Sequence, residues 1–162
     1  MKTVLEFLCL EDGAQPSLDC LRALVAKSKV SSNAYQLLQF VQRGLEFLEL
    51  HGLPNVFQQY FTTVREDGKP YTIQVAKKLD RHPPLMEFRV NWEHPDAGAF
   101  RAIFFEFQYR QYQILVFTHA VIKQKTYSAD FEAAIAAAEA ILPDFYHQPE
   151  KYINLQGADG HD

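Results

Sequence analysis

The sequence lacks the cysteine content and the short motifs that identify many protein classes. Among its 162 residues are only two cysteines, Cys9 and Cys20, and they do not form a CxxC pair. Two such cysteines make neither a disulfide framework nor a zinc knuckle, so we expect reduced thiols. The motifs GxSxG, GxGxxG, HExxH and the P-loop are all absent. These absences exclude the hydrolases, dinucleotide-binding proteins, zincins and nucleoside triphosphatases that depend on those motifs.

Long hydrophobic runs are missing as well. Glu6 interrupts the apolar stretch Val4–Leu10, so the opening of the chain does not have the pattern of a signal peptide. No stretch is long and apolar enough to span a membrane. The histidines are scattered without metal-ligand spacing. We therefore expect a cytoplasmic protein that has no membrane partner, no metal and no cofactor.

The composition that remains is that of a globular chain rich in large side chains. Hydrophobic residues make up 48% of the sequence and aromatic residues 14%, which favours substantial β structure. The length is sufficient for one domain with a sizeable core. We predict a single domain over residues 1–152, followed by a loose tail over residues 153–162.

Charge is distributed unevenly along the chain. The net charge is −4, but residues 69–125 carry nine Lys/Arg against five Asp/Glu, and the rest carries seven against fifteen. The overall charge argues against a generally nucleic-acid-binding surface. A basic middle segment in an acidic chain can nevertheless form a local anion-binding surface.

Three apolar runs at residues 85–92, 99–110 and 112–125 form the predicted centre of the fold. In the first run Met86, Phe88, Val90 and Trp92 alternate with polar residues, which is typical of a strand with one buried face. A turn over residues 93–98 and a tight reversal at residues 110–112 separate the runs. Runs that follow one another this closely predict an antiparallel meander of three strands.

Helices flank this sheet in the prediction. Residues 32–51 carry apolar residues at helical spacing and are followed by Gly52, which predicts a long helix that ends there. A preceding helix is expected to open at Pro16, with Ser17 as its N-cap. A third helix is expected from Ser128, with Pro143 closing it. Together with a strand over Val4–Leu10, these elements predict the α+β class.

Residues 54–76 interrupt this simple order of elements. Asp67-Gly68 lies between two β-prone stretches, residues 61–65 and 71–75, and such a pair is a hairpin signal. We therefore interpret this segment as a hairpin or an insertion.

Four cationic or titratable residues are predicted to share one face of the sheet. They are Arg89, Arg101, His119 and Lys123. Strand alternation allows them to converge on one surface. The alternative is an ordinary solvated face with Glu87, Glu93 and Glu106 as ion-pair partners. For His119, an alternative is a satisfied core histidine.

The basic middle segment contains four short motifs in a fixed order. They are Lys77-Lys78-Leu79, the run from Leu85 to Val90 with Glu87 and Arg89, the run from Ala99 to Phe105 with Arg101, and the run from Val116 to Thr126 with His119 and Lys123. In order and spacing they resemble the RelE/ParE toxin superfamily, most closely its phage-derived HigB-like branch. The resemblance covers residues 70–142, with Phe100 where the family usually has tyrosine, and matches the preceding helices by order only.

This resemblance implies a fold, a function and partners. The implied fold is an N-terminal strand and a helical hairpin packed on an antiparallel meander, with a C-terminal helix. The implied function is that of a type II toxin, a ribosome-dependent and metal-independent mRNA endonuclease. Its partners would be mRNA on the ribosome and a helix-turn-helix antitoxin, and a homodimer is a possible arrangement. The alternatives are a non-catalytic binding module of the same fold, such as a degenerate toxin or a phage accessory protein, and a ParE-like inhibitor of DNA gyrase.

The resemblance also assigns roles to individual residues. The implied catalytic residues are Arg89, Arg101, His119 and Lys123, and the implied RNA-binding residues are Lys77, Lys78, Arg81 and Lys125. These residue types suit cleavage by a ribose 2′-hydroxyl, which needs a proton acceptor, a proton donor and fixed positive charge around the phosphorane. Arginine offers two donors to adjacent phosphate oxygens, and histidine can transfer protons near neutral pH.

Overall fold

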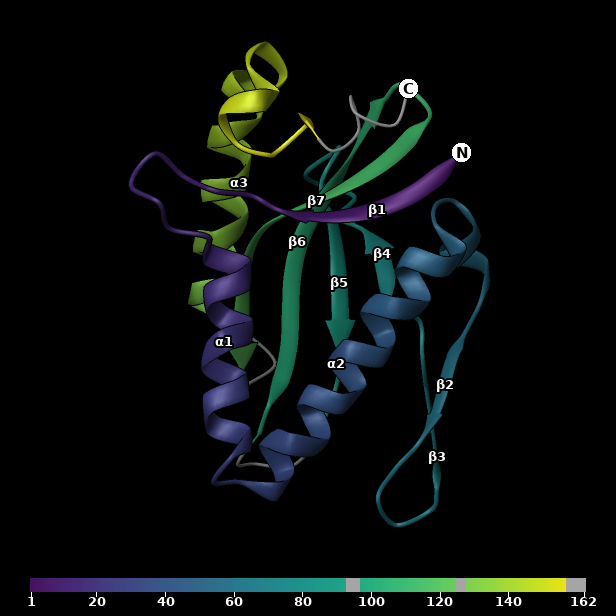
Figure 1. The fold of residues 1–162 in the computed structure, drawn as a ribbon. Coiled ribbons are helices and arrows are strands. Elements are labelled where there is room, and N and C mark those ends of the chain that lie inside the picture. Colours follow the sequence, from purple (N-terminus) through teal and green to yellow (C-terminus); the bar gives the residue numbers. More distant parts are fainter. Residues whose placement is uncertain (93–96, 125–127, 157–162) are drawn as a thin grey trace.

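A mixed sheet with helices on both faces forms the centre of the computed structural model, which describes residues 1–92, 97–124 and 128–156. Its strand order is β1-β7-β6-β5-β4. The strands are β1 (Lys2–Phe7), β4 (Ala76–Lys78), β5 (Met86–Val90), β6 (Ala99–Tyr109) and β7 (Tyr112–Lys123). In Figure 1, α1 (Pro16–Ser28) and α2 (Ser32–His51) lie in front of the sheet, and α3 (Ala129–His147) lies behind it. The predicted α+β class is confirmed.

The predicted meander forms the middle of this sheet. Strands β5, β6 and β7 pair antiparallel in sequence order, with Arg89 opposite Arg101 and Tyr109 opposite Tyr112. The face prediction is confirmed for Met86, Phe88 and Val90, which belong to the core beneath α1 and α2. Trp92 is half-buried against the same core. The parallel pairing of β1 with β7 was not predicted, because it joins opposite ends of the chain.

Helix α2 has the predicted bounds. The side chain of Ser31 accepts a hydrogen bond from the Ala34 N–H and caps the first turn. Gly52 ends the helix with a φ of +66°. A Cβ at this position would overlap the Thr3 hydroxyl and lie 2.9 Å from Gln113 Oε1, so only glycine fits where the helix meets the sheet.

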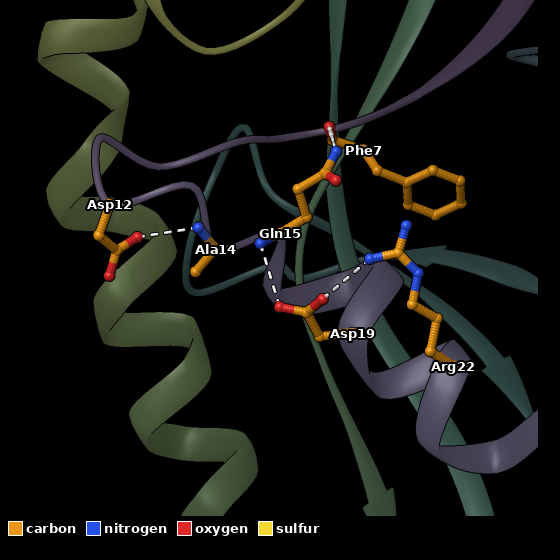
Figure 2. Close-up of polar contacts among 6 residues, drawn as sticks. All are labelled: Phe7, Asp12, Ala14, Gln15, Asp19 and Arg22. Atoms are coloured by element: carbon orange, nitrogen blue, oxygen red, sulfur yellow. Dashed lines mark hydrogen bonds and ion pairs between the residues drawn. The ribbon is translucent and has the colours of Figure 1, made fainter. Parts of the chain in front are cut away.

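Helix α1 begins differently from the prediction. Ser17 lies inside the helix and is only 1% exposed, so the assignment of Ser17 as N-cap is wrong. The N-cap is Gln15, and Figure 2 shows its N–H donating to Asp19 Oδ2 at 3.1 Å. Asp19 Oδ1 also lies 3.4 Å from Arg22 Nη1. Pro16 explains the shift, because a proline has no N–H to cap and its fixed φ suits the first helical position.

The segment between α2 and the sheet contains the predicted hairpin. Strands β2 (Phe61–Val64) and β3 (Pro70–Ile73) form a separate two-stranded sheet, preceded by the short helix η1 (Asn55–Gln58). The Glu66 N–H donates to the buried Gln36 side chain at 2.7 Å, and Arg43 Nη1 donates to Thr63 Oγ1 at 2.9 Å. Both bonds attach the hairpin to α2.

The C-terminal helix extends beyond its predicted end. The Ser128 cap is confirmed, since its hydroxyl accepts from the Phe131 N–H. Pro143 lies inside α3 and does not close it, so that prediction is wrong. Proline removes one helical hydrogen bond, but the turn beyond it places Phe145 against the rings of Phe105 and Phe107, at 4.8 and 5.2 Å. This packing stabilises the extra turn.

The chain after α3 remains packed through the short helix η2 (Pro149–Lys151). Ile153 is 6% exposed and belongs to the core beneath α3, so the packed chain extends past the predicted boundary at residue 152. Residues 157–162 of the predicted tail lie outside the described residues. Across the described ranges, none of the helices combines the length and the hydropathy needed to cross a membrane.

Candidate functional site

A cavity of about 370 Å³ lies between the α3-facing side of the sheet, the β4–β5 connection and the first turns of α3. The sheet contributes Lys77, Glu87, Arg89, Arg101 and Lys123 to its lining, the connection contributes Leu79, Asp80, Arg81 and His82, and α3 contributes Phe131, Glu132 and Ile135. Five of the eight residues predicted for the site therefore lie in one cavity.

Strand register explains why these side chains meet. Arg89 lies directly opposite Arg101, and Ala99 lies opposite Lys123. A bulge in β7 adjusts the alternation, because Ile103 pairs with His119 while Phe104 pairs with Phe117. The extra residue is Thr118, which is fully buried and donates to the Ile103 carbonyl at 3.3 Å.

The bulge determines which residues near the end of β7 lie on the side of the sheet that α3 covers. Before it, Ile114 and Val116 point toward α3. If Thr118 took a regular place in the ladder and no bulge formed, the even-numbered positions would continue on that face and Lys123 would point to the opposite side. The shift by one residue puts Lys123 in the cavity.

A buried carboxylate neutralises part of the positive charge. Glu87 is 5% exposed, and its Oε1 lies 2.9 Å from Arg101 Nε. Its Oε2 lies 3.8 Å from Lys77 Nζ. Arg89 has a different partner, since its Nε donates to the Gln74 carbonyl at 3.0 Å. The ion pair between Glu87 and Arg101 holds the guanidinium of Arg101 in the lining of the cavity.

Arg101 retains an unused donor. Its side chain is 13% exposed, and its buried Nη1 has no hydrogen-bond partner among the described residues. Burial lowers the pKa of Arg101, and the charge of Glu87 opposes that shift. A buried guanidinium donor without an acceptor is costly, and an oxyanion in the cavity would remove that cost.

The cavity as a whole is positively charged. Five Lys/Arg and His82 line it, against the carboxylates of Asp80, Glu87 and Glu132. His82 is engaged with α3, because its Nδ1 lies 2.6 Å from Glu139 Oε1. Two larger cavities, of about 730 and 650 Å³, each include a single Lys/Arg among the described residues that line them. Its positive charge therefore makes the smaller cavity the better candidate for an anion-binding site.

His119 lies on the same face of the sheet but not in the cavity lining. It is half-buried, and its Nδ1 is enclosed without a hydrogen-bond partner in the described part of the chain. Burial lowers the pKa of His119, which favours the neutral imidazole. His119 is therefore not among the residues that line the cavity with Arg89, Arg101 and Lys123.

Two predicted RNA-binding residues also stand apart. Lys78 points away from Lys77, and its Nζ lies 5.7 Å from the centre of the Phe57 ring in a different cavity. Lys125 lies outside the described residues. Lys77 and Arg81 are the predicted RNA-binding residues that line the cationic cavity.

Sequence reasoning missed two parts of the site. Glu87 was considered only as an ion-pair partner, although its alternation with Phe88 places it on the same face as Arg89. The contribution of Phe131, Glu132 and Ile135 to the site was also missed, because nothing in the sequence indicates which face of the sheet α3 covers.

Comparison with protein-family models, curated proteins and solved structures finds no match for this chain. Within the described residues, no group of three or more His, Cys, Asp or Glu side chains is arranged to hold a metal ion. What the cavity offers chemically is a set of fixed guanidinium and ammonium donors beside one buried carboxylate. Such a set of donors is chemically suited to an oxyanion of phosphate type.

Proposed function

We propose that the cavity binds a phosphodiester of RNA. The observation that carries this proposal is the buried Nη1 of Arg101, which has no hydrogen-bond partner among the described residues, in a cavity that Arg89 and Lys123 also line. A phosphate group would supply the missing acceptor and would match the two-pronged geometry of the arginine. Positive charge on three neighbouring strands would hold the rest of the phosphate.

We further propose that the bound phosphodiester is cleaved, as the resemblance to RelE/ParE toxins implies. The ribose 2′-oxygen would attack phosphorus, and Glu87 would accept the 2′-hydroxyl proton. The bond to the 5′-oxygen would break, and that oxygen would take a proton from Lys123 or from water. The products are a 2′,3′-cyclic phosphate and a 5′-hydroxyl end. Arg89 and Arg101 would stabilise the charge of the phosphorane.

In this scheme the proton acceptor is Glu87 instead of His119. Glu87 lines the cavity and His119 does not. The proposed biological role is that of a type II toxin that cleaves mRNA on the ribosome and is neutralised by a helix-turn-helix antitoxin.

The second candidate is an RNA-binding module without nuclease activity. The observation that favours it is that both oxygens of Glu87 lie beside cations, Oε1 at 2.9 Å from Arg101 and Oε2 at 3.8 Å from Lys77, so the carboxylate is already engaged in ion pairs. Binding and cleavage are therefore tested separately.

Cleavage is tested with mRNA on translating ribosomes. Arg89→Ala and Lys123→Ala should each lower the rate by roughly 30- to 1000-fold, because loss of one such donor costs on the order of 2–4 kcal/mol of transition-state stabilisation. Glu87→Gln should remove cleavage while leaving RNA binding. Lys77→Ala and Lys78→Ala form a matched pair on one short strand, and only the first should weaken RNA binding.

Circular dichroism serves as the folding control for each variant. RNA binding by the wild type without cleavage would support the binding module. Failure of the wild type to bind RNA, or equal weakening by Lys77→Ala and Lys78→Ala, would contradict the cavity as the site. Growth arrest with intact mRNA but inhibited supercoiling would instead indicate a gyrase inhibitor.

A further inference from the structure

The cationic cavity has two chemically different walls. The sheet wall carries Arg89, Arg101 and Lys123, whereas the β4–β5 connection and α3 add apolar side chains beside their polar ones. These apolar side chains, called the apolar wall below, are Leu79 from the connection and Phe131 and Ile135 from α3. A bare phosphate ion would use only the first wall, so the second wall points to a ligand with an apolar or aromatic part.

The two walls are close enough to contact one small ligand. Lys123 Nζ lies 6.0 Å from the centre of the Phe131 ring, so positive charge and an aromatic ring adjoin directly. The volume of about 370 Å³ is at the lower end of the range of about 300–1,000 Å³ that is usual for small-molecule sites. That space is sufficient for one nucleotide unit and too small for several.

Two exposed carboxylates also line the cavity. Asp80 comes from the β4–β5 connection and Glu132 from the first turn of α3. An ionised carboxylate accepts hydrogen bonds and donates none, so it suits hydroxyl groups and repels phosphate. Ribose hydroxyls are suitable donors for these two positions.

We propose that the cavity accepts a single ribonucleotide unit and selects it over a deoxyribonucleotide. The phosphate lies on Arg89, Arg101 and Lys123, and the base lies against Phe131 and Leu79. The ribose hydroxyls donate to Asp80 or Glu132. This inference rests on the proposed phosphate site and adds that the base and the sugar are recognised in the same cavity.

Titration of the full chain, followed by amide chemical shifts in NMR, tests the inference. The probes are inorganic phosphate, the four ribonucleoside 5′-monophosphates and their 2′-deoxy counterparts. At least one ribonucleotide should bind about tenfold tighter than phosphate, because contact of a base with an aromatic side chain contributes about 1–3 kcal/mol. Its deoxy counterpart should bind severalfold more weakly.

Variants assign the effect to the apolar wall and to the carboxylates. Phe131→Leu should weaken the ribonucleotide about tenfold and leave phosphate binding unchanged, which also shows that the sheet wall is intact. Phe57→Leu is the matched control, because Phe57 also lies beneath a lysine but in a different cavity. Glu132→Gln and Asp80→Asn should together reduce the preference for ribose.

The outcomes separate this inference from the proposed function. If phosphate binds at the cavity and no nucleotide binds tighter, the nucleotide inference is wrong and the phosphate site stands. Equal affinity for ribonucleotides and deoxyribonucleotides would overturn the selection for ribose. If neither phosphate nor any nucleotide shifts the resonances of the cavity residues, both proposals fail.

Discussion

The two faces of the sheet are built from the same strands but differ in how completely they are closed. Under α1 and α2, the rings of Phe88, Phe100, Phe104 and Phe117 contact one another at 5.0–6.1 Å, and this face is apolar. Under α3, rings pack in this way around Phe105 and Phe145, at one end of the sheet. The other end is the cationic cavity.

The difference between the faces shows that neighbouring residues can serve separate purposes. Phe88 is fully buried in the closed face, whereas Arg89 lines the cavity. Alternation along a strand assigns one residue to stability and the next to binding. Mutations on the two faces should therefore have different consequences, even at adjacent positions.

The largest expected effect on stability comes from opening the closed face. Phe104→Ala should lower the free energy of unfolding by about 3–5 kcal/mol, because it leaves a cavity among stacked rings. Arg89→Ala on the other face should cost about 1 kcal/mol, the value of its hydrogen bond to Gln74. Urea unfolding of both variants measures the contrast. Similar losses for the two would show that the cavity face contributes to stability as much as the closed face does.

The second-largest expected effect on stability comes from breaking the buried ion pair between Glu87 and Arg101 on the cavity face. Arg101→Met should destabilise the fold by about 3 kcal/mol, because it leaves the carboxylate of Glu87 buried beside only the more distant Lys77. Adding Glu87→Met should restore much of that loss, since two apolar side chains need no partner. A double-mutant cycle in urea measures this coupling. Simple additivity of the two losses would mean that the pair is solvated, contrary to its burial.

The smallest effect is a pH dependence centred on His119. Burial lowers its pKa below the ordinary value of 6.5, so the unfolded chain binds a proton more readily than the folded one. The stability contribution is complete above pH 6.5 and is lost as the pH falls through that value toward the lowered pKa of the folded state. Melting temperatures at about pH 7.5 and 5.5 should differ less in His119→Gln than in the wild type. His51→Gln serves as the control, and an equal change in both variants would assign the dependence elsewhere.

Local patterns were sufficient to predict much of the closed face. The alternation of Met86, Phe88 and Val90 gave the correct register, and the signals at Gly52 and Ser128 mark true helix ends. These features depend on residues close in sequence. The predictions that Ser17 caps one helix and that Pro143 ends another were wrong because other residues override these local preferences. Pro16 takes the first helical position ahead of Ser17, and the packing of Phe145 stabilises the turn beyond Pro143.

The cavity was predictable only in part, since it depends on contacts between distant segments. The common face of Arg89 and Arg101 follows from alternation and pairing of neighbouring strands. The wall formed by α3 depends on where a helix about thirty residues farther along the chain packs. No pattern of neighbouring residues in the sequence predicts where that helix packs on the sheet.

The single extra residue in β7 divides that strand into two halves that are out of phase. The first half contributes alternate side chains to the packing beneath α3, and the second half contributes Lys123 to the cavity. If Thr118 took a regular place in the ladder instead of forming the bulge, alternation would continue unbroken, so that Lys123 would be directed at the apolar core and Ile122 at the proposed phosphate site. The composition of the strand would hardly change, yet a cation would be exchanged for a hydrocarbon. The bulge at one threonine therefore determines which side chains at the end of this strand face the cavity.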